Sequence, residues 1–232
     1  MLPVVYVEAD TLPEAWERAV IETWERGTSI KTQYDKPGDP LSKDATAVIV
    51  VRYPFKEPRI HKAIPCGLDG LYVYVQEVLR GVHDHWISPN KWQYTYHERL
   101  ENYTLPDNLA INQIEVVIEK LAEVPYTRRA QAITWKPWLD NNLEDPPCLQ
   151  RLWFRIFEAD GLKLVMNAHM RSNDAFKAAF MNMYAFTEIQ RYVAEKVSEK
   201  LGEKVEPGQY IHIADSFHTA RISMNSKDFW KV

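Results

Sequence analysis

The stretch from Arg151 to Met170, RLWFRIFEADGLKLVMNAHM, constrains the fold of this 232-residue chain more than any other. Two runs rich in branched and aromatic side chains flank Asp160 and Gly161, a residue pair that is typical of tight hairpin turns. The sequence therefore predicts an antiparallel hairpin, and with it a sheet that the rest of the chain has to cover.

Strand and helix patterns surround this hairpin without strict alternation, and no change in composition or flexible linker divides the chain. We therefore expect one α/β (α+β) domain spanning residues 1–232, with a mixed sheet covered by helices. Strand patterns occupy residues 4–10, 45–55, 127–135 and 208–215, and helical patterns occupy residues 12–26, 69–81, 108–122 and 173–200.

Two of the expected helices carry recognisable end signals. The first should begin at a cap formed by Asp10 or Thr11 and end at Gly27. The helix over 69–81 is expected to begin at Asp69, which would act as its cap.

Composition narrows the possible functions. The net charge is −4 without a lysine or arginine block, which argues against broad nucleic-acid binding. No apolar run approaches the eighteen or so residues of a membrane span, and the N-terminal residues lack the pattern of a secretory signal. The two cysteines, Cys66 and Cys148, are expected to be free thiols in a reducing cytoplasm.

Four short motifs follow one another along the second half of the chain. Each has an ordinary structural explanation when it is taken alone, such as a solvated arginine pair, a buried cysteine or a helix cap. The motifs are YTRRAQAITW with Arg128 and Arg129, DPPCLQ with Cys148, MRSNDAFKAAFMNMYAF with Arg171, Ser172, Asp174 and Asn182, and HIADSFHTA with His218.

Taken together, these residue types favour chemistry on a phosphorylated substrate. Three arginines and a serine are good phosphate ligands, because guanidinium groups bind phosphate oxygens in pairs. A cysteine beside such cations is expected to have a lowered pKa and therefore more thiolate. The set is suited to covalent catalysis by Cys148.

The ordered set of motifs resembles the thymidylate synthase family, including its archaeal members and the related pyrimidine nucleotide hydroxymethylases. The resemblance implies that Cys148 adds to carbon 6 of a pyrimidine nucleoside monophosphate and makes carbon 5 nucleophilic. Carbon 5 of dUMP would then take a one-carbon unit from a reduced pterin co-substrate, giving dTMP. The co-substrate would be 5,10-methylenetetrahydrofolate or its methylene-tetrahydromethanopterin analogue.

The resemblance also implies roles for individual residues. Asn182 matches the asparagine that reads the pyrimidine edge, and an asparagine rather than an aspartate there favours uracil. Tyr96, in QYTYHERL, and Glu77, in YVQEVLRG, match residues of the catalytic machinery. The implied substrate ligands are Arg128, Arg129, Arg171, Ser172, Asn182 and His218, and Asp174 is the implied cofactor ligand.

Several departures from the family pattern leave alternatives open. Leu149 replaces the histidine that usually follows the nucleophile, and Ala220 stands where a tyrosine usually contacts the sugar. The segment Lys177-Ala178-Ala179 replaces a glycine-rich helix start, and the chain after the last motif is short. The alternatives are a hydroxymethylase acting on dUMP, dCMP or CMP, and a catalytically silent paralogue that binds nucleotide.

Two further expectations concern metals and assembly. The His-Asp-His stretch at 83–85 has chelating spacing but lacks a third ligand at a sensible distance in sequence, so no metal is expected. The resemblance implies a homodimer formed sheet to sheet, in which Arg128 and Arg129 reach the phosphate bound by the neighbouring chain.

Overall fold

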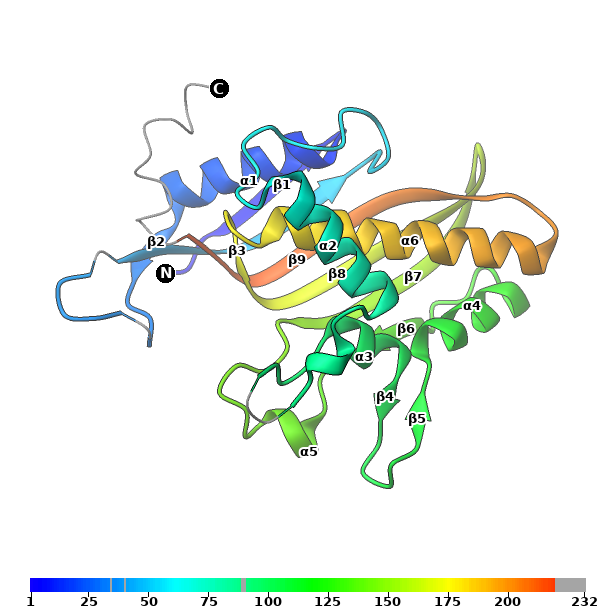
Figure 1. The fold of residues 1–232 in the computed structure, drawn as a ribbon. Coiled ribbons are helices and arrows are strands. Elements are labelled where there is room, and N and C mark those ends of the chain that lie inside the picture. The colour runs from blue at the N-terminus through cyan, green and yellow to red at the C-terminus, as the bar shows by residue number, and fades with distance from the viewer. Residues whose placement is uncertain (34, 40, 89–90, 220–232) are drawn as a thin grey trace.

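A computed structural model describes residues 1–33, 35–39, 41–88 and 91–219. Its centre is a mixed sheet of seven strands, with helices packed on one face (Figure 1). The expected mixed sheet covered by helices is confirmed. Ala220 and the residues after it lie outside the described part of the chain.

The strand order mixes parallel and antiparallel neighbours. The pairs β1–β3 and β8–β9 are parallel, whereas β3–β9, β7–β8 and β6–β7 are antiparallel. The short strands β4 and β5 form a separate ribbon. Along the main sheet the order is β1 (Val4–Ala9), β3 (Ser42–Val51), β9 (Val205–Thr219), β8 (Gly161–Asp174), β7 (Leu149–Ala159) and β6 (Ala130–Ile133), with β2 (Thr28–Ile30) paired to β3.

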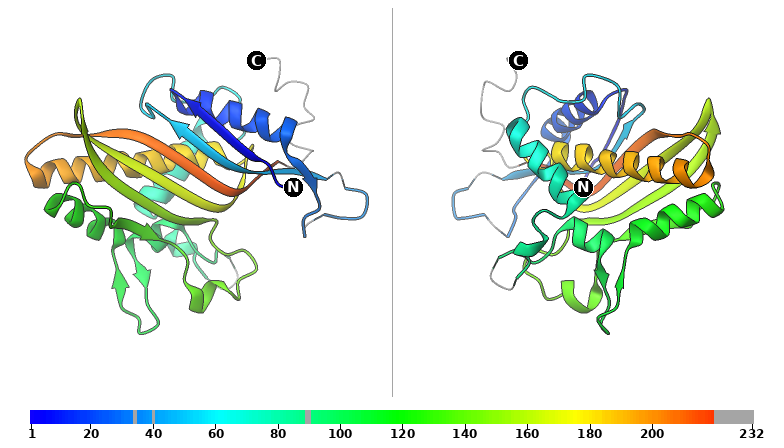
Figure 2. Two further views of the ribbon diagram at one scale, coloured as in Figure 1. Left: turned by 180° about the vertical axis from the view of Figure 1, so that it is seen from behind. Right: turned by 45° about the vertical axis from the view of Figure 1, so that its right-hand side comes forward.

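The helices form one layer on the sheet and a partial second layer. Helices α1, α4 and α6 contact the strands, and α2 packs against α6. The left view of Figure 2 looks onto the opposite face of the sheet, where the described residues place no helix. The helices are α1 (Leu12–Arg26), α2 (Gly67–Arg80), α3 (Tyr96–Glu101), α4 (Gln113–Glu123), α5 (Pro137–Asp140) and α6 (Ala179–Leu201), with a 3-10 turn η1 (Asp84–Trp86) and the ribbon strands β4 (Tyr103–Thr104) and β5 (Ala110–Ile111) between them.

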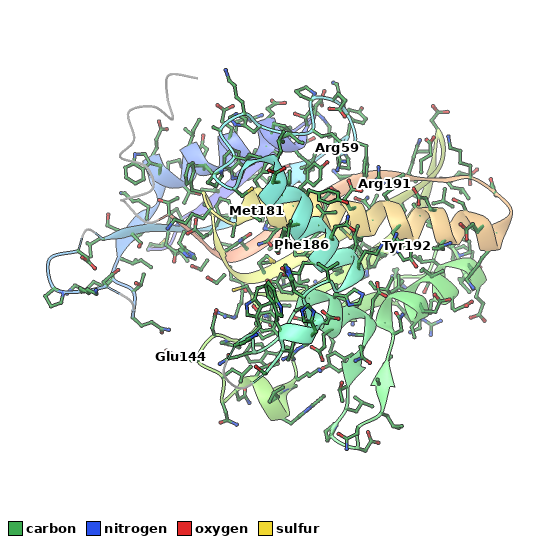
Figure 3. All side chains as sticks on the ribbon, viewed as in Figure 1. Arg59, Glu144, Met181, Phe186, Arg191 and Tyr192 are labelled. Atoms are coloured by element: carbon green, nitrogen blue, oxygen red, sulfur yellow. The ribbon has the colours of Figure 1, made fainter. Side chains whose placement is uncertain are left out.

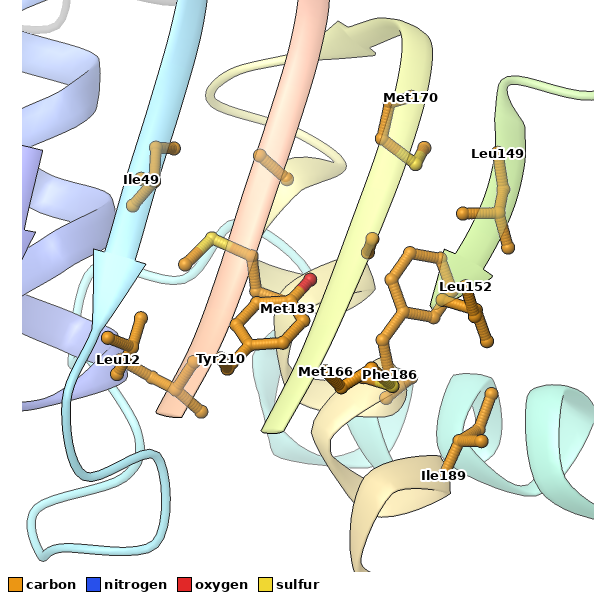
Figure 4. Packing of buried hydrophobic residues seen from close by; sticks show 14 of the residues in the cluster. Leu12, Ile49, Leu149, Leu152, Met166, Met170, Met183, Phe186, Ile189 and Tyr210 are labelled. Atoms are coloured by element: carbon orange, nitrogen blue, oxygen red, sulfur yellow. The ribbon is translucent and has the colours of Figure 1, made fainter. Parts of the chain in front are cut away.

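The predicted hairpin is confirmed as β7 and β8. Gly161 takes a positive φ of 78°, a backbone conformation that residues with a side chain rarely adopt. Side chains alternate between the two faces of β7, so that Leu152 and Phe154 are buried while Trp153 points to the open face. Figure 4 shows Leu152 beside Phe186 of α6 in the packed core.

Helix α1 agrees with its expected bounds, and its cap is Thr11, whose side chain accepts from the N–H of Glu14. The cap expected at Asp69 is wrong. Helix α2 begins at Gly67 after Cys66, which places Asp69 inside the first turn, where a carboxylate still complements the helix dipole.

Three other element starts differ from the sequence patterns. Helix α4 begins only at Gln113, because Asn112 caps it through a 2.9 Å bond from the N–H of Glu115. Helix α6 begins at Ala179 rather than near 173, because β8 continues to Asp174 in its pairing with β9. Strand β6 covers only Ala130–Ile133 of the expected 127–135.

A buried ion pair ties two distant segments beneath the sheet edge. The two terminal guanidinium nitrogens of Arg99 in α3 donate to the carboxylate of Asp140 in α5, at 2.9 and 2.8 Å, and each side chain is at most 1% exposed. Asp140 also accepts from the backbone N–H of Lys136 at 2.6 Å. The pair therefore fixes α3, which carries Tyr96, against the segment that leads to Cys148.

We expect Asp140→Asn to lower the free energy of unfolding by about 3 kcal/mol, because the buried Arg99 charge then keeps only Glu98, 3.0 Å from its Nε, which it shares with Lys136. Urea denaturation measures this loss. The matched control is Glu25→Gln, which removes one carboxylate charge from an exposed position of α1 and should change stability little. A loss below about 1 kcal/mol for Asp140→Asn would contradict the assigned role of the pair.

Candidate active site

A cavity of about 1070 Å³ opens where β7, β8 and β9 approach α2, α3 and the start of α6. Glu144, on the loop before β7 (Figure 3), lies on its wall. Among the residues proposed from the sequence, the cavity is lined by Glu77, Tyr96, Cys148, Arg171, Ser172, Asp174, Asn182 and His218.

Cys148 immediately precedes β7 and sits partly buried in the cavity wall. Its carbonyl oxygen accepts from the backbone N–H of Arg171 at 2.8 Å, which extends the β7–β8 pairing by one more bond. The Arg171 guanidinium turns back and donates to the carbonyl oxygens of Pro146 and, at 3.1 Å, Pro147. Arg171 therefore fixes the backbone on which the thiol stands.

Within one chain, the pKa of the Cys148 thiol lies above its ordinary value. Burial raises its pKa, and the nearby Arg171 cation only partly offsets this effect. The expected lowering of the pKa is therefore wrong for the single chain. The physical reason is that Arg128 and Arg129 do not line the cavity, so desolvation of the thiolate outweighs the one adjacent cation.

Three tyrosines surround the thiol. The hydroxyl of Tyr96 accepts from the backbone N–H of Leu149 at 3.2 Å, and its ring lies 5.7 Å from that of Tyr94. The hydroxyl of Tyr74, on α2, donates to the side-chain oxygen of Asn182 on α6. Burial raises the pKa of all three phenols, which keeps them neutral hydrogen-bond donors.

Glu77 lies one turn after Tyr74 on α2, so both side chains face the cavity. Its carboxylate is only 12% exposed, and burial raises its pKa. The ring nitrogen Nδ1 of His83 lies 2.9 Å from Glu77 Oε2. Glu77 is therefore a carboxyl group whose pKa lies above its ordinary value, and this shift favours proton exchange, as an acid–base residue requires.

The opposite wall comes from β9 and β3. His218 and Ser216 lie two residues apart on β9 and both line the cavity. Asp44 pairs with His218 across the strands, and its buried carboxylate accepts from the Ser216 hydroxyl at 2.9 Å. No sequence pattern pointed to Asp44, whereas strand periodicity from His218 could have identified Ser216.

Asp174 both accepts hydrogen bonds from the backbone and lines the cavity. One carboxylate oxygen accepts from the backbone N–H groups of Phe176 and Lys177, at 3.0 and 2.7 Å. These bonds form a turn between β8 and α6, whose cap position is Ala178 and receives no side-chain bond, so the capping explanation of this motif is wrong. The Asp174 side chain also lies on the cavity wall.

Arg128 and Arg129 lie apart from the other predicted ligands. Both are exposed and precede β6, and the indole of Trp153 donates to the Arg128 carbonyl at 3.0 Å. Since Trp153 faces the open side of the sheet, the arginine pair sits beside that side and away from its own chain's cavity.

The described residues form no cluster of three or more His, Cys, Asp or Glu side chains that could hold a metal ion. In the His-Asp-His stretch, Asp84 instead bonds to Thr95 and His97. Among the described helices, none combines the length and the apolar character that crossing a membrane requires.

Comparison with known proteins gives consistent matches. The family model described as thymidylate synthase matches residues 74–225. A Methanosarcina mazei protein named "Putative thymidylate synthase" is 30% identical over 212 residues, which cover 91% of this chain and 88% of that protein. A Methanocaldococcus jannaschii protein of the same name is 29% identical over 217 residues, covering 91% and 89%.

Among solved structures, the thermostable thymidylate synthase A from Bacillus subtilis matches with a TM-score of 0.65 and 16% identity. The match covers 90% of this chain and 79% of that chain. At this identity the likeness concerns the fold, and it agrees with the mixed sheet described above.

We expect Arg171→Gln to raise the pKa of Cys148 further, by about one pH unit, because it removes the cation that favours the thiolate. The measurement is the pH dependence of alkylation in a Cys66→Ser background, where Cys148 is the single thiol. Arg171→Lys keeps the charge and should shift the midpoint less. An unchanged or lowered midpoint in Arg171→Gln would show that Arg171 does not act on the thiol.

Proposed function

Because this chain belongs to the thymidylate synthase family, we propose that it transfers a one-carbon unit to carbon 5 of dUMP and forms dTMP. The observation that carries the proposal is the position of Cys148. Its thiol shares one cavity with the cation of Arg171, the amide of Asn182 and the carboxyl group of Glu77.

Cys148 is the proposed nucleophile. Its thiolate forms a bond with carbon 6, and the ring electrons move to carbon 5 and the exocyclic oxygen. After carbon 5 has taken up the one-carbon unit, its proton leaves to a base. The bond from that unit to the pterin nitrogen would then break, a hydride from the reduced pterin would convert the unit to a methyl group, and sulfur would leave carbon 6. Tyr96 is the proposed residue at this proton removal, since its hydroxyl is fixed beside the start of β7.

The cavity fits a nucleotide together with a second planar ligand. Its volume of about 1070 Å³ exceeds that of most sites for a single small ligand. The rings of Trp92 and Tyr94 line it, and Asp174 offers a carboxylate to the amino group of a pterin. When bound, 5,10-methylenetetrahydrofolate or its methanopterin analogue would supply the one-carbon unit.

Asn182 is the proposed reader of the base. Its carbonyl oxygen would accept from the ring N–H of uracil while its amide donates to the exocyclic oxygen. The hydroxyl of Tyr74 donates to the same carbonyl oxygen, which leaves a second lone pair of that oxygen for the ring N–H. Arg171 and Ser172 are the proposed phosphate ligands from the same chain, and His218 is the proposed sugar ligand.

We further propose a homodimer joined through the open faces of two sheets. That face carries exposed apolar side chains, including Ile133 and Phe157, which are 39% and 43% exposed. An isologous contact would bring Arg128 and Arg129 to the partner's cavity, supplying the cations that a single chain lacks there. Their charge would lower the pKa of Cys148. We place the reaction in the cytoplasm, where free thiols such as these persist.

The first test is the product formed from dUMP or dCMP with methylenetetrahydrofolate or methylene-tetrahydromethanopterin, identified by mass. We expect a methyl product from dUMP, and no product with Cys148→Ser, because a hydroxyl ionises far less readily than a thiol. Cys66→Ser is the matched control and should retain activity, since Cys66 does not line the cavity. A hydroxymethyl product, or none with protein that binds dUMP, would support one of the two alternatives instead.

The second test concerns the base. We expect Asn182→Asp to lower the preference for dUMP over dCMP by about tenfold to a hundredfold, because the carboxylate loses the donor to the exocyclic oxygen of uracil. Steady-state kcat/KM values for both nucleotides measure the preference. An unchanged ratio would remove Asn182 from base selection.

The third test concerns the shared site. Mixing inactive Cys148→Ser chains with inactive Arg129→Ala chains should restore activity, because one site of each mixed dimer then carries neither defect. The mixed dimers are isolated through two different affinity tags before assay. If verified mixed dimers are inactive, Cys148 and Arg129 serve the cavity of the same chain, and the shared-site proposal is wrong.

A further inference from the structure

The His-Asp-His stretch at 83–85 does not act as one unit. His83 bonds to Glu77, whereas Asp84 bonds to the Thr95 hydroxyl at 2.5 Å and to His97 Nδ1 at 2.7 Å. His85 is exposed. Three adjacent residues that could pass for a metal-binding motif therefore have three separate environments.

The ring of His83 is held on two sides. It stacks on Trp86 with 3.9 Å between ring centres and an angle of 11°, and it meets the edge of Trp92 at 5.4 Å. Its side chain is 17% exposed. This packing fixes the direction of Nδ1, which lies 2.9 Å from Glu77 Oε2. The packing of the segment between α2 and α3 therefore fixes the contact between His83 and Glu77.

The charges around Glu77 are few. Tyr74 on the same helix is a neutral phenol, and Asp84 disfavours the ionised form of Glu77. His83 favours the ionised form, against the larger effect of burial. Asp84 in turn contacts His97 of α3, and His97 lies 3.7 Å from Glu101, on which Arg80 at the end of α2 also acts.

We propose that His83 is a positioning residue for Glu77, whose carboxylate it holds at the cavity wall through the bond from Nδ1–H to Oε2. The bond leaves Oε1 as the oxygen that exchanges a proton with the substrate. His83 keeps its own proton throughout and stabilises the charge that Glu77 carries after giving up its proton. This inference rests on the proposed function of Glu77 as an acid–base residue.

The test uses His83→Phe, which keeps an aromatic ring against Trp86 but removes the Nδ1 donor. The matched control is His85→Phe, two positions along on the exposed side. His83→Asn supplies a side-chain N–H near the same place. The first readout is the titration of the Glu77 carboxyl group by ¹³C NMR in protein without substrate, assigned with Glu77→Gln.

We expect His83→Phe to raise the Glu77 titration midpoint by about one to two pH units, since a hydrogen bond to a charged group is lost. The limb of the kcat–pH profile that reports Glu77 should shift in the same direction. His83→Asn should recover part of the shift, and His85→Phe should cause none. An unmoved midpoint in both His83 variants would overturn the inference, whether or not either variant turns over dUMP.

The two proposals fail in different ways. If the wild type forms no product from dUMP but the NMR midpoint shifts as expected, the proposed function falls and the His83–Glu77 coupling stands. If turnover is normal and the midpoint does not move, the coupling falls and the proposed function stands. If His83→Phe does not fold, the NMR titration of His83→Asn against the wild type decides, with a raised Glu77 midpoint supporting the coupling and an unmoved or lowered midpoint overturning it.

Discussion

The backbone hydrogen bond from Arg171 to the carbonyl of Cys148, 2.8 Å long, joins the two sides of the candidate site. It continues a β7–β8 register that begins at the Asp160–Gly161 turn and pairs Leu149 with Met170. Because the hairpin is long and its inner face is packed against α6, a slip of one residue would expose its core. The position of the thiol is thus set by strand pairing through the whole hairpin.

The cavity combines ionisable groups with little compensating positive charge. Burial raises the pKa of both Cys148 and Glu77, and the described lining offers Arg171 and lysines from flanking loops as cations. Within one chain, such a site disfavours the thiolate form of Cys148, and additional positive charge nearby would favour it. The exposed position of Arg128 and Arg129 beside the open sheet face explains how a second chain could supply that charge.

The elements and residues that could be predicted from the sequence are those that depend on neighbours along the chain. The hairpin and the helix over 12–26 follow from turn chemistry and periodicity, whereas the eight cavity residues follow from the resemblance of their motifs to a known family. Residues whose position depends on contacts between distant segments could not be predicted in this way. Asp44 reaches the cavity only through pairing of β3 with β9, and Tyr74 becomes relevant only because α2 crosses α6. The expected lowering of the Cys148 pKa is wrong for the same reason. Arginines in motifs near Cys148 in sequence need not lie beside its thiol in the fold.

The central claim, that Cys148 bonds to carbon 6 of the pyrimidine, can be measured without any pterin. Addition at carbon 6 makes carbon 5 exchange its hydrogen with solvent, so dUMP incubated with the protein in D₂O gains one mass unit when carbon 5 takes up deuterium. We expect this exchange with the wild type and with Cys66→Ser, and its loss with Cys148→Ser. Exchange that persists in Cys148→Ser, or that is absent from wild-type protein shown to bind dUMP, would contradict the covalent role of Cys148.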